Sequence, residues 1–215
     1  MVVKVGILGG TFDPIHLGHL LMAKEAMVQC DLDKVLFVPN RQSPLKKKAP
    51  RVTNFHRLNM LELATDEIAG FEVSDFEIRK KGPSYTVETV KHFKEKSIQN
   101  TQLYFILGED SFLSIDKWKN PSLLLSLLSF CVFRRLLSEK NAGKLLSVAA
   151  LNQLMIPIMN EKKKMKTTIF APVSNISSSQ VRQFTEQRKS ISVLVPRAVE
   201  EYILRHQLYH NEEQP

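Results

Sequence analysis

Short apolar segments alternate with helical segments along most of this chain. The first apolar segment, VVKVGIL at 2–8, is rich in valine and isoleucine and is followed by two glycines, a pattern typical of a strand buried on both faces. A helical pattern starts at Gly18, and the next apolar segment, KVLFVPN at 34–40, predicts a second strand that Pro39 ends. Strand, helix and strand in this order form a βαβ unit.

The same alternation continues beyond this unit. It predicts further helices at 54–68, 84–96, 121–128, 144–155, 177–187 and 196–209, and further strands at 71–78, 102–108, 129–135 and 167–173. Repeated βαβ units predict an α/β fold in which a doubly wound, mostly parallel sheet carries helices on both faces. In such sheets the ligand crevice lies beyond the carboxyl ends of the strands, where the strand order reverses. We expect one domain over 1–215, with a helical C-terminal portion from about 177.

The composition narrows the class of protein. With 43% hydrophobic and 24% charged residues, the chain is typical of globular proteins. The first ten residues do not resemble a signal peptide, and the most apolar window, 123–133, is too short for a membrane span of about 20 residues. We therefore expect a cytoplasmic protein that does not bind a membrane, with 123–133 forming a buried helix followed by a buried strand.

The formal net charge of +8 favours anionic partners, which include nucleotides, nucleic acid and acidic lipid. The densest basic runs, LKKKAPR at 45–51 and EKKKMK at 161–166, contain no aromatic residue that could stack on a base, so no nucleic acid partner is expected. Cys30 and Cys131 are far apart in sequence and fit no metal-binding or redox spacing, which favours free, buried thiols over a disulfide. A homo-oligomer is compatible with the sequence.

The stretch GILGGTFDPIHLGH at 6–19 carries the densest group of chemically useful residues. It matches neither of the two common glycine-rich phosphate-binding motifs. Gly9 and Gly10 would let a phosphate approach the backbone closely, and helix amides exposed near Gly18 would attract an anion. His16 and His19 are three residues apart at the start of a helix, so they can point to the same side and donate hydrogen bonds to phosphate oxygens.

Other interpretations of these histidines are weaker. A lone histidine is more often structural, but a pair beside glycines at a strand end favours a phosphate site. A zinc site is not expected, because the spacing is not H-E-x-x-H and no third ligand is evident.

A second segment, ISSSQVR at 176–182, also suits a polyphosphate. Three serines at the start of a helix offer hydroxyls and unpaired amides, and Arg182 can add a planar cation. Alternatively, Ser177 is only the helix cap and Arg182 is only solvated.

Together the two segments identify a family resemblance. GGTFDPIHLGH resembles the first signature of the H-x-G-H nucleotidyltransferases, which are doubly wound, Rossmann-like adenylyl- and cytidylyltransferases, and ISSSQVR resembles their second. Along nearly its full length the chain resembles the bacterial nicotinate-nucleotide adenylyltransferases. The matching stretches are VLFVPN, FHRLNMLELA, KGPSYTVETV, ILGEDSFLSIDKWK and LVPRAVEEYILRHQLY.

The resemblance implies a role for each matching residue. It assigns catalysis to His16, His19, Lys46 and Arg182. It assigns ATP binding to Gly9, Gly10, Thr11, Phe12, Gly18, Gly108, Asp110, Ile176, Ser177 and Ser178, with Gly108 and Asp110 against the ribose. It assigns mononucleotide binding to Asn40, Tyr85, Thr86, Trp118 and Arg134, with Trp118 stacked on the nicotinate ring and amides around Tyr85 and Thr86 on its carboxylate. Trp118 can instead be a core residue.

The chain departs from the family pattern at two places. Where the family has P-P-H-[KR], this chain has SPLKK, so Leu45 replaces the histidine and Lys46 keeps the phosphate-directed charge. The segment VFRRLL lacks the glycine that usually follows the arginine, which leaves open whether Arg134 or Arg135 reaches the mononucleotide phosphate.

The resemblance implies an enzyme of NAD biosynthesis. It would transfer AMP from ATP to nicotinate mononucleotide, giving nicotinate adenine dinucleotide and pyrophosphate, with Mg²⁺ carried on the ATP and no metal site of its own. One alternative is a related transferase that prefers nicotinamide mononucleotide or another phosphate acceptor. The other is a non-catalytic nucleotide- or RNA-binding module on the same fold.

Overall fold

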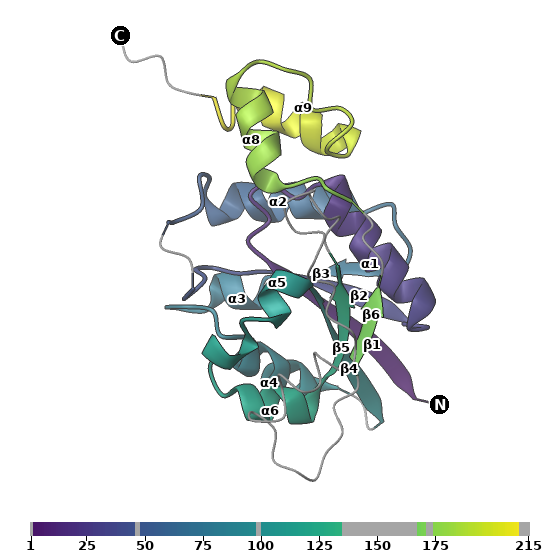
Figure 1. Ribbon diagram of the computed structural model, residues 1–215. Helices are drawn as coiled ribbons and strands as arrows, with labels where there is room; N and C mark the ends of the chain where they lie inside the picture. Colours follow the sequence, from purple (N-terminus) through teal and green to yellow (C-terminus); the bar gives the residue numbers. More distant parts are fainter. Residues whose placement is uncertain (1, 46–47, 98–99, 135–166, 171–173, 211–215) are drawn as a thin grey trace, which may run out of the picture.

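Six parallel strands form one sheet at the centre of the protein (Figure 1). A computed structural model describes residues 2–45, 48–97, 100–134, 167–170 and 174–210. The strands are β1 (Val3–Gly10), β2 (Lys34–Pro39), β3 (Phe71–Val73), β4 (Thr101–Gly108), β5 (Ser129–Phe133) and β6 (Thr167–Phe170). Their order is β3-β2-β1-β4-β5-β6, and every neighbouring pair is parallel. The predicted doubly wound parallel sheet is confirmed, and its order reverses between β1 and β4.

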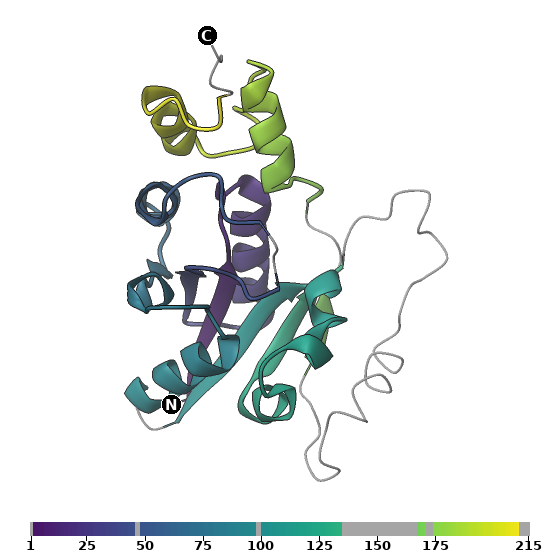
Figure 2. The ribbon, with the colours of Figure 1, turned by 90° about the vertical axis from the view of Figure 1, so that its left-hand side faces the viewer.

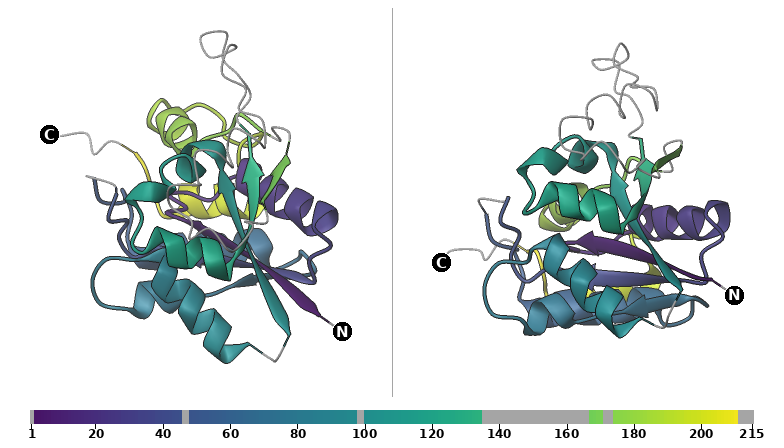
Figure 3. Two further views of the ribbon diagram at one scale, coloured as in Figure 1. Left: turned by 60° about the horizontal axis from the view of Figure 1, so that its bottom comes forward. Right: turned by 90° about the horizontal axis from the view of Figure 1, so that it is seen from below.

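Helices cover both faces of the sheet (Figures 1 and 2). They are α1 (Leu17–Gln29), α2 (Asn54–Thr65), α3 (Phe76–Arg79), α4 (Thr86–Lys96), α5 (Glu109–Phe112), the 3₁₀ helix η1 (Ile115–Lys117), α6 (Pro121–Leu127), α8 (Ser178–Glu186) and α9 (Arg197–Arg205). The helices α1 and α2 lie on one face, with α8 and α9 stacked beyond them, and α4 and α6 lie on the other (Figures 1 and 3). None of the helices in the described ranges is long and apolar enough to cross a membrane.

Alternating side chains of the central strands build a core on each face. On β4, Phe105 and Leu107 join the core under α4 and α6, whereas Ile106 between them joins the core under α1 and α2. On β1, Ile7 and Leu8 divide between the same two cores. Successive side chains of a strand point to opposite faces, which is why a continuous apolar run correctly predicted strands buried on both sides.

Most predicted elements are confirmed, including the buried helix and strand within 123–133, which are α6 and β5. The strand predicted at 71–78 is wrong after Val73, because the chain turns into the short helix α3. There Arg79 N donates to Asp75 O at 3.0 Å, and an ion pair joins the two side chains within one helical turn. The helix predicted at 144–155 lies outside the described residues.

Candidate active site

The first signature begins at the carboxyl end of β1, beside the reversal of strand order. β1 ends at Gly10, whose carbonyl accepts a hydrogen bond from Asn40 N at the end of β2 (2.8 Å). The loop then leads to His16, which is the N-cap of α1. Phe12, in this loop, is only 1% exposed and packs edge-on against His19 with ring centroids 5.0 Å apart.

The two histidines stack on each other, as their spacing predicted. Their ring centroids are 3.7 Å apart, and the planes are inclined by 30°. His16 N donates to His19 Nδ1 at 3.3 Å. Because Nδ1 accepts this bond, the neutral His19 ring carries its proton on Nε2, where it can be donated to a ligand. Burial lowers the pKa of His16 to about 4, so that imidazole is neutral near pH 7.

Gly18 lies in a tightly packed place at the start of α1. A Cβ at this position would lie 3.0 Å from His16 Nδ1 and 3.1 Å from Ser174 Oγ. The preceding amide, Leu17 N, already donates to Leu194 O at 2.9 Å. A side chain at position 18 would therefore press on the His16 ring and on Ser174.

The second signature meets the first through residues that are 164 and 169 positions apart in the chain. Ser178 Oγ donates to Pro14 O at 2.8 Å, and Arg182 donates to Asp13 O at 2.6 Å. Ser177 is the N-cap of α8, and its side chain accepts from Gln180 N at 3.2 Å, so it acts as a helix cap here. Thus Ser178 and Arg182 join the two signatures.

Asp13 is the centre of this junction. Its carboxylate accepts from Tyr209 Oη at 2.9 Å and from Arg51 N at 2.8 Å, and Arg182 lies 3.9 Å from it. Asp13 is 6% exposed and Tyr209 is 4% exposed. Burial and the neighbouring carboxylate raise the pKa of the Tyr209 hydroxyl, so it stays a hydrogen-bond donor. Tyr209, in the segment beyond the end of α9, therefore helps to hold the first signature.

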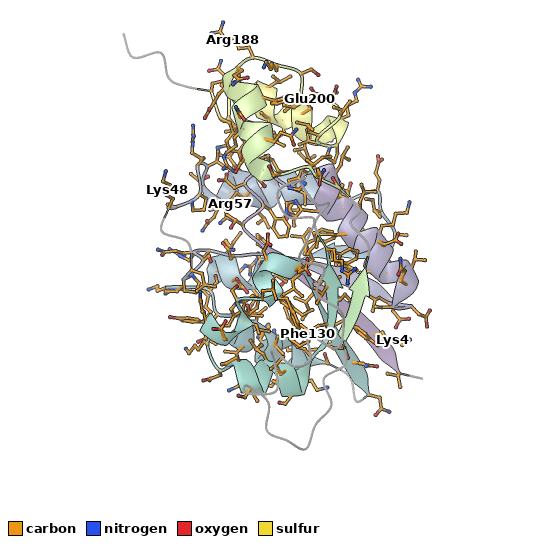
Figure 4. The ribbon with its side chains drawn as sticks, in the orientation of Figure 1. Lys4, Lys48, Arg57, Phe130, Arg188 and Glu200 are labelled. Atoms are coloured by element: carbon orange, nitrogen blue, oxygen red, sulfur yellow. The ribbon has the colours of Figure 1, made fainter. Side chains whose placement is uncertain are left out.

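A cavity of about 520 Å³ opens beside this junction, and we call it the basic pocket. Three of its residues are cationic, which suits a polyphosphate. Lys48 lies at the outer edge of the molecule in Figure 4. The pocket is lined by Thr11, Asp13, Lys48, Ala49, Pro50, Arg51, Ser178, Ser179 and Arg182.

A smaller cavity of about 190 Å³ lies at the reversal of strand order, and we call it the switch-point pocket. Thr11 lines both pockets, so they share a wall. Trp118 lines it too, packs edge-on against Phe105 with ring centroids 5.8 Å apart, and has a buried Nε1 without a partner in the described structure. The polar lining residues are Thr11, Asn40, Glu77, Ser84, Thr86, Thr89 and Ser111.

Comparison with known proteins agrees with this geometry. A family model described as cytidylyltransferase-like matches residues 7–184. A relative from Synechococcus sp. (strain JA-3-3Ab) is 38% identical over 206 residues, covering 96% of this chain and 94% of the relative. A relative from Clostridium novyi (strain NT) is 40% identical over 195 residues, covering 90% and 92%. Both carry the name probable nicotinate-nucleotide adenylyltransferase. The chain belongs to the nicotinate-nucleotide adenylyltransferase family.

Solved structures share the fold. One is the Plasmodium falciparum nicotinic acid mononucleotide adenylyltransferase complexed with APC, which matches with a TM-score of 0.72 and 21% identity over 96% of this chain and 97% of that chain. The same enzyme complexed with NaAD gives a TM-score of 0.73. At this identity the likeness establishes the fold alone.

The segment that departs from the family pattern lies beside the basic pocket. Leu45 is exposed, and Lys46 lies outside the described residues, so its assignment stays a prediction. Lys48 and Arg51, by contrast, line the pocket without having been predicted. The basic run at 45–51 indicated a group of cations, but the sequence could not show which of them would line a pocket.

Two buried ionisable residues were also missed. Arg57 of α2 is fully buried and donates to Thr11 O at 2.5 Å and Asn40 O at 2.6 Å, so it ties together the ends of β1 and β2 (Figure 4). Burial lowers the pKa of Arg57. Glu77 of α3 lines the switch-point pocket and accepts from Thr89 Oγ1 at 2.5 Å. Burial raises the pKa of Glu77.

Five other predicted residues line neither of the two pockets. Gly108 ends β4 and caps α5, with Asp110 in the first turn of that helix. Tyr85 caps α4, beside Thr86 of the switch-point pocket. Ile176 is half-buried, and its amide donates a hydrogen bond to Ser174 Oγ at 3.0 Å. Arg134 directly follows β5, and Arg135 lies outside the described residues.

Proposed function

We propose that the chain transfers the adenylyl group of ATP to nicotinate mononucleotide, giving nicotinate adenine dinucleotide and pyrophosphate in NAD biosynthesis. The observation that carries this proposal is the junction of Ser178 and Arg182 with the Asp13–Pro14 backbone beside the basic pocket, which adjoins the switch-point pocket at Thr11. One pocket suits a triphosphate, and the other suits a flat ring beside Trp118. The names of the relatives support the same reaction.

The reaction needs no nucleophile from the protein. An oxygen of the mononucleotide phosphate attacks the α-phosphorus of ATP in line, and the bond to the β-phosphate oxygen breaks. Catalysis then consists of positioning the two phosphates and stabilising the charge that grows on pyrophosphate. In the proposal ATP lies in the basic pocket and the mononucleotide in the switch-point pocket, so that the phosphates meet near Thr11.

The stacked histidines act as hydrogen-bond donors in this scheme, and His16 does so as a neutral imidazole. His19 donates through Nε2, because its Nδ1 is engaged with His16 N. Arg182 supplies a fixed positive charge, since two hydrogen bonds already orient its guanidinium group. Lys48 and Arg51 add charge at the outer part of the basic pocket, where the leaving pyrophosphate would lie.

Magnesium enters the proposal as part of the substrate. Within the described ranges no group of three acidic, histidine or cysteine side chains could hold a metal ion, and the Asp13 carboxylate is engaged by Tyr209 and Arg51. A site of this kind suits an ion that arrives on the triphosphate. When bound there, Mg²⁺ would neutralise charge on the phosphate oxygens. We place the reaction in the cytoplasm, where free thiols stay reduced.

The acceptor is distinguished in the switch-point pocket. A nicotinate carboxylate accepts hydrogen bonds, and donors are available from Trp118 Nε1 and from the backbone at the start of α4 beside Tyr85 and Thr86. A nicotinamide group is neutral and also donates, so the two acceptors differ in charge and in hydrogen bonding. This difference supports nicotinate as the preferred acceptor.

The proposal is tested by incubating the purified full chain with ATP, Mg²⁺ and either mononucleotide while pyrophosphate release is measured. We expect faster release with nicotinate mononucleotide, and a large loss in the Arg182→Gln variant. Faster release with nicotinamide mononucleotide would instead indicate the related transferase. ATP binding without pyrophosphate release from any acceptor would indicate the non-catalytic module.

A further inference from the structure

The two cysteines of the chain contact each other, although 101 residues separate them. Cys30 is the residue that ends α1, and Cys131 lies in the middle of β5, paired with Ile106 of β4. Their Sγ atoms are 3.0 Å apart. A movement of about 1 Å would bring the two sulfurs to the length of a covalent S–S bond. The thiols were predicted to be free, and as free thiols they nevertheless form a pair.

The two thiols differ in their access to solvent. Cys131 is fully buried in the core under α1, whereas Cys30 is half-buried at the margin of that core. A small oxidant can therefore reach Cys30 first. Cys131 then lies directly behind it, where no solvent-borne thiol can compete with it.

The surroundings favour Cys30 as the reactive thiol. The hydrogen bond from Cys131 and the charge of Lys4 lower the pKa of Cys30. Lys4 is held nearby, because its Nζ forms an ion pair with Asp31 at 3.1 Å. The same hydrogen bond and burial raise the pKa of Cys131, so Cys30 carries the thiolate of the pair.

We propose that Cys30 and Cys131 are a thiol-oxidation site, at which a peroxide forms an intramolecular disulfide that a dithiol reverses. The Cys30 thiolate attacks one peroxide oxygen and breaks the O–O bond, giving a sulfenic acid at Cys30 and, after protonation, water. The Cys131 sulfur then attacks the Cys30 sulfur and expels hydroxide, which takes the Cys131 proton and leaves as a second water. Two thiols thus lose two electrons and two protons, and one peroxide is reduced to two waters.

The disulfide would join the C-terminal end of α1 to the middle of β5. Lys4, beside this thiol pair, and Lys48, at the basic pocket, lie at opposite sides of the molecule in Figure 4. The histidines are at the other end of α1, a helix of 13 residues that spans roughly 20 Å. Oxidation should therefore raise the thermal unfolding temperature, because it closes a long loop in the unfolded chain, and leave catalysis within about twofold.

The test treats the reduced full chain with graded hydrogen peroxide, blocks the remaining thiols by alkylation and measures the intact mass. We expect an unalkylated monomer about 2 Da lighter than the reduced chain, a linked peptide containing Cys30 and Cys131, and a raised unfolding temperature. Dithiothreitol should reverse all three changes. These readouts do not depend on the proposed enzyme activity.

Two variants separate the steps. In Cys131→Ala the reaction should stop at a Cys30 sulfenic acid that dimedone traps, and in Cys30→Ser the remaining buried thiol should react at least tenfold more slowly than the wild-type pair. The proposal is overturned if wild-type protein gives only doubly alkylated chain, only intermolecular dimers, or sulfinic acid without a linked peptide. Equal peroxide sensitivity of Cys30→Ser and wild type would overturn the order of the two steps.

Discussion

Replacing His19 should reduce turnover far more than it reduces stability. The imidazole has two separable roles: Nδ1 accepts from His16 N at 3.3 Å, and in the proposed mechanism Nε2 donates to the substrate. Loss of one donor at a preorganised charge-stabilising site costs about 10²- to 10³-fold in rate, or about 3 to 4 kcal/mol. Loss of a helix-capping bond costs about 1 kcal/mol of unfolding free energy, which in a chain of this size is a fall of about 2 to 4 °C in unfolding temperature.

Two substitutions at the same position separate these roles. His19→Ala removes both the cap acceptor and the imidazole donor. His19→Asn keeps an amide oxygen that can accept from His16 N, but its short side chain does not reach as far as imidazole Nε2. We expect His19→Asn to recover most of the lost stability while its turnover stays at least about tenfold below wild type.

The measurements are steady-state pyrophosphate release at saturating ATP and nicotinate mononucleotide, together with thermal unfolding followed by circular dichroism. Wild-type turnover in either variant would refute the catalytic role of His19. Global unfolding of His19→Ala at room temperature would refute the separation of the two roles. Equal stability of the two variants would show that the Nδ1 contact contributes nothing to the fold.

Four further outcomes follow from the described contacts. Tyr209→Phe leaves the buried Asp13 carboxylate without one donor and should lower the unfolding free energy by about 2 kcal/mol in urea titrations; an unchanged midpoint would contradict the role of this bond. Gly18→Ala should displace the His16 ring and lower turnover at least about tenfold, and unimpaired pyrophosphate release would argue against that packing constraint. Burial lowers the pKa of His16 to about 4, so below about pH 6.5 the unfolded chain binds a proton at this residue that the folded chain excludes. The unfolding free energy should therefore fall by about 2 kcal/mol between pH 7 and pH 5. An equal fall in a His16→Gln variant would contradict this. Glu77→Gln should keep the oxygen that accepts the hydrogen bond from Thr89 of α4. It should lower the KM for nicotinate mononucleotide relative to nicotinamide mononucleotide by a few fold, because it removes a potential negative charge beside the nicotinate carboxylate. A KM ratio that moves the other way would count against the placement of the mononucleotide in this pocket.

Some of the site was accessible from sequence because it depends on local geometry. The spacing of His16 and His19 fixes two side chains on one side of a helix start, and the structure stacks them there. Ser177 was weighed as a helix cap on the residue type alone, and it caps α8. The prediction of a strand at 71–78 was wrong beyond Val73, because over so short a segment the apolar residues fit the repeat of a helix as well as that of a strand. The contact of Glu77 with Thr89 of α4 favours a helical turn there.

The sequence by itself determined the alternation of strands and helices, the parallel sheet and the two family signatures, because these depend on the apolar period and on residues close together in the chain. Only the tertiary structure decided which distant groups meet. It joined Arg182 to Asp13, placed Lys48 in the lining of the basic pocket and brought Cys30 against Cys131. The physical reason is that such contacts depend on the order of strands in the sheet and on how helices pack across it, and no local pattern of residues encodes either.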